Sequence, residues 1–127
     1  MSNEDQIRQT LIDTLPELAE IKDEALRGQV VDAWTYSLSR SSFDSIDEIP
    51  ASGNPDTPAL KSGTQADHIR GVTRLAIGIA DTLVDQFPDL PVNRDLLVAC
   101  ALCHDVGKPF EFDPKNQDRW RENQSAT

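Results

Sequence analysis

The sequence predicts an all-α protein, and three observations support this prediction. Apolar residues recur every three or four positions over several long segments, which is the spacing of one face of a helix. A helix-capping pattern, Thr64 followed three residues later by Asp67, precedes the longest of these segments. No segment alternates apolar and polar residues well enough to predict a strand. We therefore expect a helical bundle without a sheet.

The chain is expected to divide into N-terminal helices (1–39), a loop (40–63) and a helical core (64–127). The first helix should end at about Thr14, and the second should carry Pro16 in its first turn, where a missing N–H costs little. We expect the second helix to run towards Leu38, with Gly28 as a candidate break. Its early polar residues are interpreted as a solvated face: Glu17, Glu20, Lys22, Asp23 and Glu24.

The loop at 40–63 is rich in Ser, Pro and Gly, which favours turns. Loops this long within a domain are often functional. Both a substrate-contacting lid and a plain connector remain open interpretations.

His68 lies in the first turn of the helix that Thr64 is expected to cap. Apolar residues follow His68 at +4, +7, +11 and +15: Val72, Leu75, Ile79 and Leu83. This stripe predicts that the histidine points along the buried face. Taken alone, His68 is more simply a hydrogen-bonded core histidine.

His104 and Asp105 end the apolar segment 96–103, in a helix expected to start after Asn93 and to run to about Gly107. Adjacent helical residues diverge by about 100°, so both side chains can touch one ion only at the helix edge. A facing helix would supply His68, and the chain contains only these two histidines. Imidazole with carboxylate suits manganese, iron, nickel, cobalt or zinc better than calcium.

Lys108 follows His104 by four residues, and Pro109 is expected to stop the helix there. An ammonium beside a metal requires an anion between them, which suits a phosphate oxyanion. For Lys108 alone, a solvent-facing cation at a helix end is the simpler interpretation.

Together, residues 67–72 and the His-Asp-Val-Gly-Lys segment at 104–108 resemble the HD-domain superfamily of metal-dependent phosphohydrolases. The resemblance implies about five core helices, a divalent transition metal held by His68, His104 and Asp105, and hydrolysis of a phosphate ester or nucleotide-like small anion by a metal-activated water. It further implies that Asp105 and Lys108 are catalytic. Three basic residues become candidate substrate contacts: Lys108, Arg70 and Arg74.

The family's last aspartate normally comes from a later helix. The later aspartates here, Asp113 and Asp118, lie too close to the motif to be comfortable substitutes. The resemblance therefore implies a domain that lacks its C-terminal helices. A missing C-terminal segment, favoured here, or a second chain would complete the site; otherwise the site is degenerate.

Parts of the sequence are compatible with other functions. The segment from Cys100 to His104 matches the haem-attachment pattern, but no export signal accompanies it, and we interpret Cys100 and Cys103 as core residues. A di-iron oxygenase of the same superfamily and a non-catalytic metal-binding or interaction module remain alternatives. Four aromatic residues could line a nucleobase pocket but are more simply core: Trp34, Tyr36, Phe110 and Trp120.

The net charge of −10 repels polyanions, so we expect a small anionic substrate and no nucleic acid polymer. The N-terminus is acidic where a signal peptide would be basic. No stretch approaches the roughly 18 apolar residues of a membrane span. These features predict a soluble cytoplasmic protein with no membrane contact.

Overall fold

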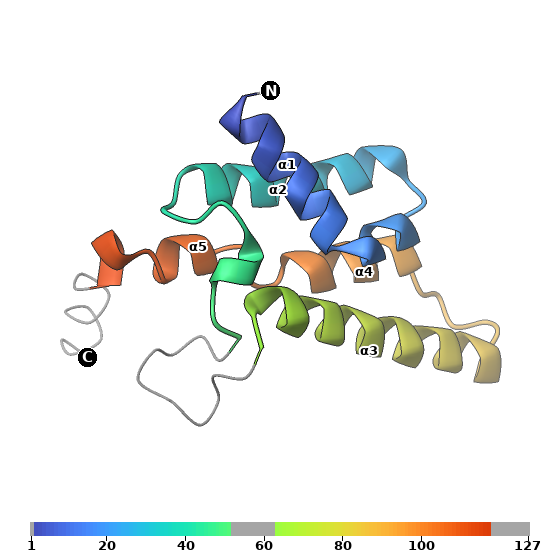
Figure 1. Ribbon diagram of the computed structural model, residues 1–127. Helices are drawn as coiled ribbons and strands as arrows, with labels where there is room; N and C mark the ends of the chain where they lie inside the picture. The colour runs from blue at the N-terminus through green and yellow to red at the C-terminus, as the bar shows by residue number, and fades with distance from the viewer. Residues whose placement is uncertain (1, 52–62, 118–127) are drawn as a thin grey trace.

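The computed structural model describes residues 2–51 and 63–117, and its regular structure there is helical (Figure 1). Within those ranges the only extended pairing is an isolated bridge between Pro50 and Thr64, so the all-α prediction is confirmed. None of the described helices is long and apolar enough to cross a membrane. The elements are α1 (Asn3–Thr14), η1 (Pro16–Glu20), α2 (Glu24–Ser39), η2 (Ile46–Glu48), α3 (Gln65–Gln86), α4 (Arg94–Cys103) and α5 (Lys108–Glu111).

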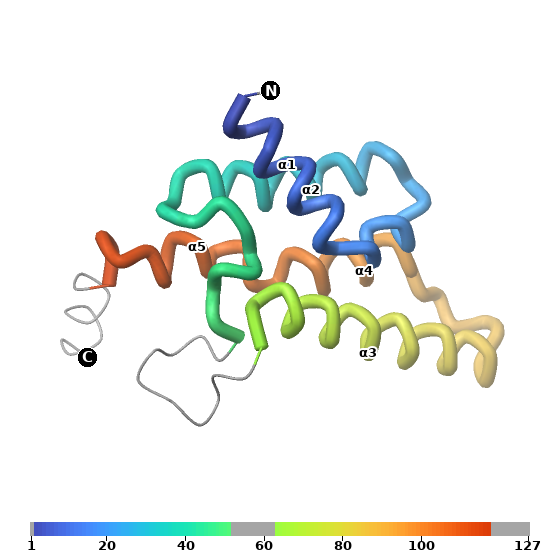
Figure 2. Tube along the Cα trace, in the orientation of Figure 1, coloured from blue at the N-terminus to red at the C-terminus, as the bar shows by residue number. Residues whose placement is uncertain are grey.

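Helix α4 is the centre of the bundle, because it packs against both α2 and α3. The tube in Figure 2 shows α4 running between these two longer helices, with α1 crossing α2 on the outside. One hydrophobic cluster joins the N-terminal helices to α3 and α4, and its members include Leu11, Trp34, Ile69 and Leu102. The N-terminal helices and the segment after the loop therefore share a single core.

The sequence suggested a break in the second helix at Gly28. In the structure the break lies instead at residues 21–23, between η1 and α2. Both carboxylate oxygens of Asp95 accept hydrogen bonds from backbone amides at this break, those of Lys22 and Asp23, each at 3.0 Å. These bonds lower the pKa of Asp95 below its usual value. Asp23 then caps α2 by accepting from the amides of Ala25 and Leu26. The long-range contact with Asp95 therefore stabilises the break at residues 21–23, whereas local propensity suggested a break at Gly28.

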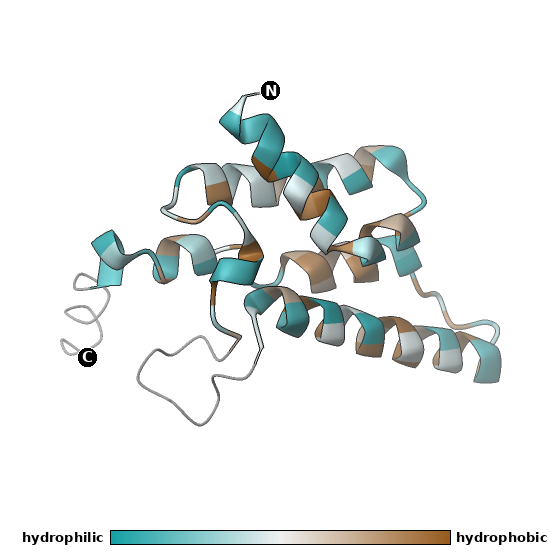
Figure 3. Cartoon of the chain, in the orientation of Figure 1, coloured by the Kyte–Doolittle hydropathy of each residue, from teal (hydrophilic) through white to brown (hydrophobic). Residues whose placement is uncertain are grey.

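Helix α3 buries a different face from the one that the sequence predicted. Its buried residues are Gln65, Ala66, Ile69, Thr73 and Ala80, and the helix packs against α4. The stripe that was expected to be buried is largely exposed: Leu75 at 70%, Ile79 at 61% and Leu83 at 38%. Figure 3 shows apolar bands recurring along α3. The helix therefore has two apolar faces, of which the described residues cover one.

Helix α4 ends at Cys103, earlier than the predicted Gly107, and residues 104–107 form a turn. Pro109 does not stop this helix. It lies in the first turn of α5, where its missing N–H is tolerated. His104 and Asp105 therefore lie on a turn between two helices, which removes the constraint of a regular 100° divergence.

Trp34 provides a test of the packing. Its side chain is fully buried, and its Nε1 donates to the Leu102 carbonyl oxygen at 2.8 Å. We expect Trp34→Ala to lower the free energy of unfolding by about 3–5 kcal/mol in urea denaturation. Leu75→Ala is the matched control and should change it by less than about 0.5 kcal/mol. Comparable losses of unfolding free energy in both variants would contradict the assignment of Trp34 to the core and of Leu75 to an exposed face of α3.

Candidate metal centre

The entry into α3 is fixed by a capping box and by the end of the preceding loop. The Thr64 side chain accepts from the Asp67 amide, and the Asp67 carboxylate accepts from the Thr64 amide, as the sequence predicted. The amide of Gln65 donates to the Ile49 carbonyl oxygen at 2.7 Å. The first turn of α3, which carries His68, is thus held at a defined place beside η2.

The turn after α4 is held by side chains of α2. Trp34 Nε1 donates to the Leu102 carbonyl oxygen at 2.8 Å, and Ser37 Oγ donates to the Val106 carbonyl oxygen at 2.6 Å. The Leu102 carbonyl lies in the last turn of α4, where carbonyls lack intrahelical partners, and the Val106 carbonyl lies in the turn that follows, so the two bonds satisfy both groups and fix the turn. His104 and Asp105 lie between these two anchored carbonyls.

Two imidazoles and one carboxylate converge where α3 meets this turn. His68 Nε2 lies 3.3 Å from His104 Nε2. Asp105 Oδ2 lies 3.1 Å from His68 Nε2 and 3.2 Å from His104 Nε2. These three residues, which the sequence predicted as a set, form a triangle of potential ligand atoms, called the His-His-Asp triangle below.

A hydrogen bond sets the tautomer that His104 favours. Its Nδ1 lies 2.6 Å from the Ala101 carbonyl oxygen, which can only accept, so Nδ1 carries the proton. In a neutral ring Nε2 then presents a lone pair toward Asp105 Oδ2, which is also an acceptor. Two such atoms at 3.2 Å repel unless a hydrogen-bond donor, such as an N–H of His68, or a metal ion lies between them.

The triangle also has suitable dimensions for a metal. Atoms about 2.1 Å from one ion lie about 3.0 Å apart in octahedral sites and about 3.4 Å apart in tetrahedral ones. The three separations observed here, 3.1, 3.2 and 3.3 Å, fall within that interval. The side chains of His68 and His104 are 38% and 35% exposed, so solvent and a small substrate can reach the triangle. The donor set therefore fits a divalent transition metal.

Comparison with known proteins identifies the family. The sequence model of the HD-domain family matches residues 66–126 of this chain. A dihydroneopterin 2',3'-cyclic phosphate phosphodiesterase of Methanocaldococcus jannaschii is 35% identical over 107 residues, which are 80% of this chain and 42% of that relative. This chain belongs to the HD-domain superfamily. It spans less than half the length of the curated relative, and no solved structure matches it.

The structure places Lys108 in the first turn of α5 and not, as predicted, on the helix that carries His104. Its Nζ forms an ion pair with Glu111 Oε2 at 3.0 Å and lies 5.2 Å from the centre of the Phe112 ring. The side chain of Lys108 is 24% exposed. Its predicted contact with phosphate stays a prediction.

The two candidate arginines both pair with Glu17 of η1. Arg70 Nε lies 3.1 Å from both Glu17 carboxylate oxygens, and Arg74 Nε lies 3.7 Å from one of them. Glu17 is only 7% exposed, so its expected place on a solvated face was wrong. These arginines compensate a buried carboxylate, and their predicted contact with substrate stays a prediction.

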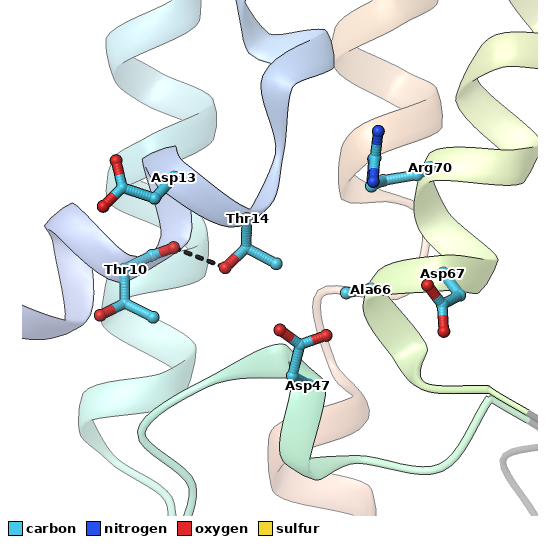
Figure 4. A pocket seen from close by; sticks show the side chains of 7 residues that line it. All are labelled: Thr10, Asp13, Thr14, Asp47, Ala66, Asp67 and Arg70. Atoms are coloured by element: carbon cyan, nitrogen blue, oxygen red, sulfur yellow. Dashed lines mark hydrogen bonds between the residues drawn. The ribbon is translucent and has the colours of Figure 1, made fainter.

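Arg70 also lines a cavity of about 370 Å³ between α1, η2 and α3 (Figure 4). The carboxylates of Asp13, Asp47 and Asp67 line the same cavity, which makes it unfavourable for an anion. Residues two positions apart on a helix diverge by about 200°, so Arg70 points away from the side of α3 that carries His68. The cavity is therefore separate from the His-His-Asp triangle.

Asp113, one of the two later aspartates, has a structural role. It is fully buried, and its oxygens accept from the amide and the hydroxyl of Ser42 at 2.8 and 2.9 Å and from the Lys115 amide at 3.2 Å. Burial alone would raise the pKa of Asp113, but these hydrogen bonds outweigh it and lower the pKa below its usual value. Asp118 lies outside the described residues.

The cysteines and aromatic residues only partly match their predicted core positions. Cys100 is exposed, whereas Cys103 packs against the core, and burial raises the pKa of its thiol. A raised pKa disfavours the thiolate that metal binding requires. Trp34 is fully buried, but Tyr36 and Phe110 are exposed and line an apolar cavity of about 610 Å³. Trp120 lies outside the described residues.

Gln65 is a residue of this site that the sequence analysis missed. Its Nε2 donates to Asp105 Oδ2 at 2.6 Å. Gln65 precedes His68 by three residues, and residues three apart on a helix are neighbours on its surface. That spacing was the available signal.

Asp113 gives a pH-dependent prediction. We expect Asp113→Asn to lower the free energy of unfolding by about 1–3 kcal/mol at pH 7, because it removes a charged acceptor from a buried network. The pKa of Asp113 is lower in the folded than in the unfolded chain, so its contribution is present above about pH 4 and is lost as the pH falls further. Urea denaturation at pH 7 and pH 3 should show the difference from wild type shrinking. Asp89→Asn, at an exposed loop position, is the control, and a difference that does not depend on pH would contradict the assignment.

Proposed function

We propose that this protein is a metal-dependent phosphohydrolase that acts on a small anionic phosphate ester. The single observation that carries the proposal is the His-His-Asp triangle, with separations of 3.1–3.3 Å between its potential ligand atoms. Membership of the HD-domain superfamily supports the same chemistry. His68, His104 and Asp105 are the proposed ligands, and the metal is manganese, iron, nickel, cobalt or zinc.

A bound divalent ion would supply acidity to a water molecule and polarise a phosphoryl oxygen. The residues of the chain prepare this chemistry. The Ala101 carbonyl keeps the His104 proton on Nδ1, so Nε2 stays available as a ligand. Asp105 contributes a negative charge that the two neutral imidazoles lack, and its 18% exposure limits competition from solvent.

Lys108 is the proposed phosphate contact. An ammonium has three donors, so Lys108 can keep its ion pair with Glu111 while donating to a phosphate oxygen. Its flexible four-carbon stem allows the movement that such an exchange requires. Arg70 and Arg74 remain weaker candidates for substrate contact, because both already form ion pairs with Glu17.

For the substrate, we propose a small cyclic phosphodiester. The relative from Methanocaldococcus jannaschii is named for a 2',3'-cyclic phosphate substrate, and this supports the same class here. The net charge of −10 disfavours a polyanion, whereas a metal at the triangle would attract a single phosphate locally.

We further propose that a C-terminal helical segment completes the site. The exposed stripe on α3, formed by Leu75, Ile79 and Leu83, is an apolar face without cover in the described residues. It lies on the same helix as His68. The curated relative extends far beyond the matched region, which supports an additional segment over a second copy of the chain. Such a segment could also supply a further carboxylate ligand.

Metal analysis tests the proposed site. We expect wild-type protein to bind about one Mn²⁺ per chain and His104→Ala to bind none, because one corner of the triangle is lost. At a free concentration of 100 times Kd, the ion should stabilise the wild type by about 2.7 kcal/mol, and it should leave the variant unchanged. Wild-type protein should also hydrolyse a 2',3'-cyclic nucleotide when Mn²⁺ is added.

Cys100→Ala is the matched control, because it removes an exposed potential ligand four residues before His104 and should leave metal binding intact. Stoichiometric metal retained in His104→Ala would contradict the proposed ligands. Wild-type protein that neither binds nor uses manganese, nickel or cobalt would contradict the hydrolase and favour a non-catalytic module. Two iron ions per chain would favour the oxygenase alternative.

Sedimentation velocity distinguishes the two ways of covering the α3 stripe. We expect this 127-residue chain to sediment as a monomer, unchanged by Leu75→Lys, because the proposed cover is a later segment and not a second copy. A dimer that Leu75→Lys dissociates would show instead that a second copy covers the stripe.

A further inference from the structure

Gln65 combines deep burial with a short contact to the metal-binding triangle. The residue is fully buried at the start of α3. Its Nε2 donates to Asp105 Oδ2 at 2.6 Å, the same oxygen that faces both imidazoles. Its Oε1 is also buried and has no hydrogen-bond partner among the described residues.

The chemistry of the contact fixes the orientation of the amide. A carboxylate oxygen only accepts, so the NH₂ group must face Asp105, and a flipped amide would place two acceptors against each other. Oε1 is thereby left without a donor, which is unfavourable for folding. A long apolar side chain would fill the same space without that cost. The polar end of Gln65 therefore serves Asp105 and not the stability of the core.

We infer that Gln65 is a positioning residue that holds Asp105 Oδ2 at the point where the two imidazoles meet, and so tightens metal binding. The inference rests on the proposed function, because it assumes that Asp105 is a ligand. A carboxylate oxygen has two lone pairs, so Oδ2 can accept from Gln65 while its other lone pair faces an ion. Groups that hold a ligand in this way commonly matter to affinity almost as much as the ligand itself.

The backbone of Gln65 makes it a rigid support. Its amide is bonded to the Ile49 carbonyl oxygen at 2.7 Å, and the capping box of Thr64 and Asp67 flanks it. His68 lies in the same first turn of α3. One short segment therefore carries one ligand directly and orients a second ligand that belongs to the turn after α4.

The test compares Gln65→Met with wild type by titration with Mn²⁺ and by thermal unfolding of the metal-free proteins. Methionine keeps the length of the side chain but cannot donate. We expect the affinity for Mn²⁺ to fall by about 10–100-fold. The Tm of the metal-free variant should equal or exceed that of the wild type, because an unpaired buried acceptor is gone.

Thr73→Val is the matched control. Thr73 is also fully buried on α3, and its hydroxyl donates to the Ile69 carbonyl oxygen, away from Asp105. Thr73→Val should leave the affinity for Mn²⁺ unchanged whatever it does to Tm. This control separates an effect on the metal centre from a general effect on the helix.

Wild-type affinity in Gln65→Met, with His104→Ala unable to bind, would overturn this inference and leave the proposed function standing. No binding of Mn²⁺ by the wild type would overturn both. Gln65→Leu offers a second apolar shape if methionine packs poorly. If both variants unfold well below the Tm of Thr73→Val, Gln65 serves the fold and the inference is wrong.

Discussion

The structure depends on one electrostatic constraint: a carboxylate oxygen and two imidazole nitrogens lie within 3.3 Å of one another. With the His104 proton on Nδ1, its Nε2 and Asp105 Oδ2 present lone pairs to each other, so the arrangement is favourable only with a hydrogen-bond donor or a cation among them. An N–H group of His68 can fill this place, and so can a divalent ion. The HD-domain relationship and the spacing of the ligand atoms favour the ion. The supports from α2 and η2 keep these groups together despite their repulsion.

Local rules predicted the features that short segments determine. The capping box of Thr64 and Asp67 and the end of the first helix at Thr14 appear where the sequence placed them, because caps depend on a few neighbouring residues. The grouping of His68, His104 and Asp105 was also predicted, from the motif and from the chain having only two histidines. The structure brings these three side chains together.

Features that depend on packing between distant segments were not predictable in this way. Helix α3 has two apolar faces, and periodicity cannot tell which one meets α4. The local sequence around Glu17 is typical of a surface residue. In the structure, however, Glu17 pairs with Arg70, which lies 53 positions later in the sequence. The role of Gln65 depends on Asp105, 40 positions away, and the spacing of Gln65 from His68 indicates only that the two share a helix face, not that Gln65 contacts Asp105. The sequence suggested that Pro109 stops a helix. In the structure Pro109 lies in the first turn of a new helix, because the turn at residues 104–107 has already ended α4.

The central claim is that the His-His-Asp triangle holds a divalent metal. Anomalous diffraction at the manganese absorption edge, from crystals of this protein soaked in Mn²⁺, tests it most directly. We expect one strong peak about 2.0–2.3 Å from His68 Nε2, His104 Nε2 and a carboxylate oxygen of Asp105. A protein whose manganese peaks all lie elsewhere, with the two imidazoles hydrogen-bonded to Asp105 alone, would contradict it.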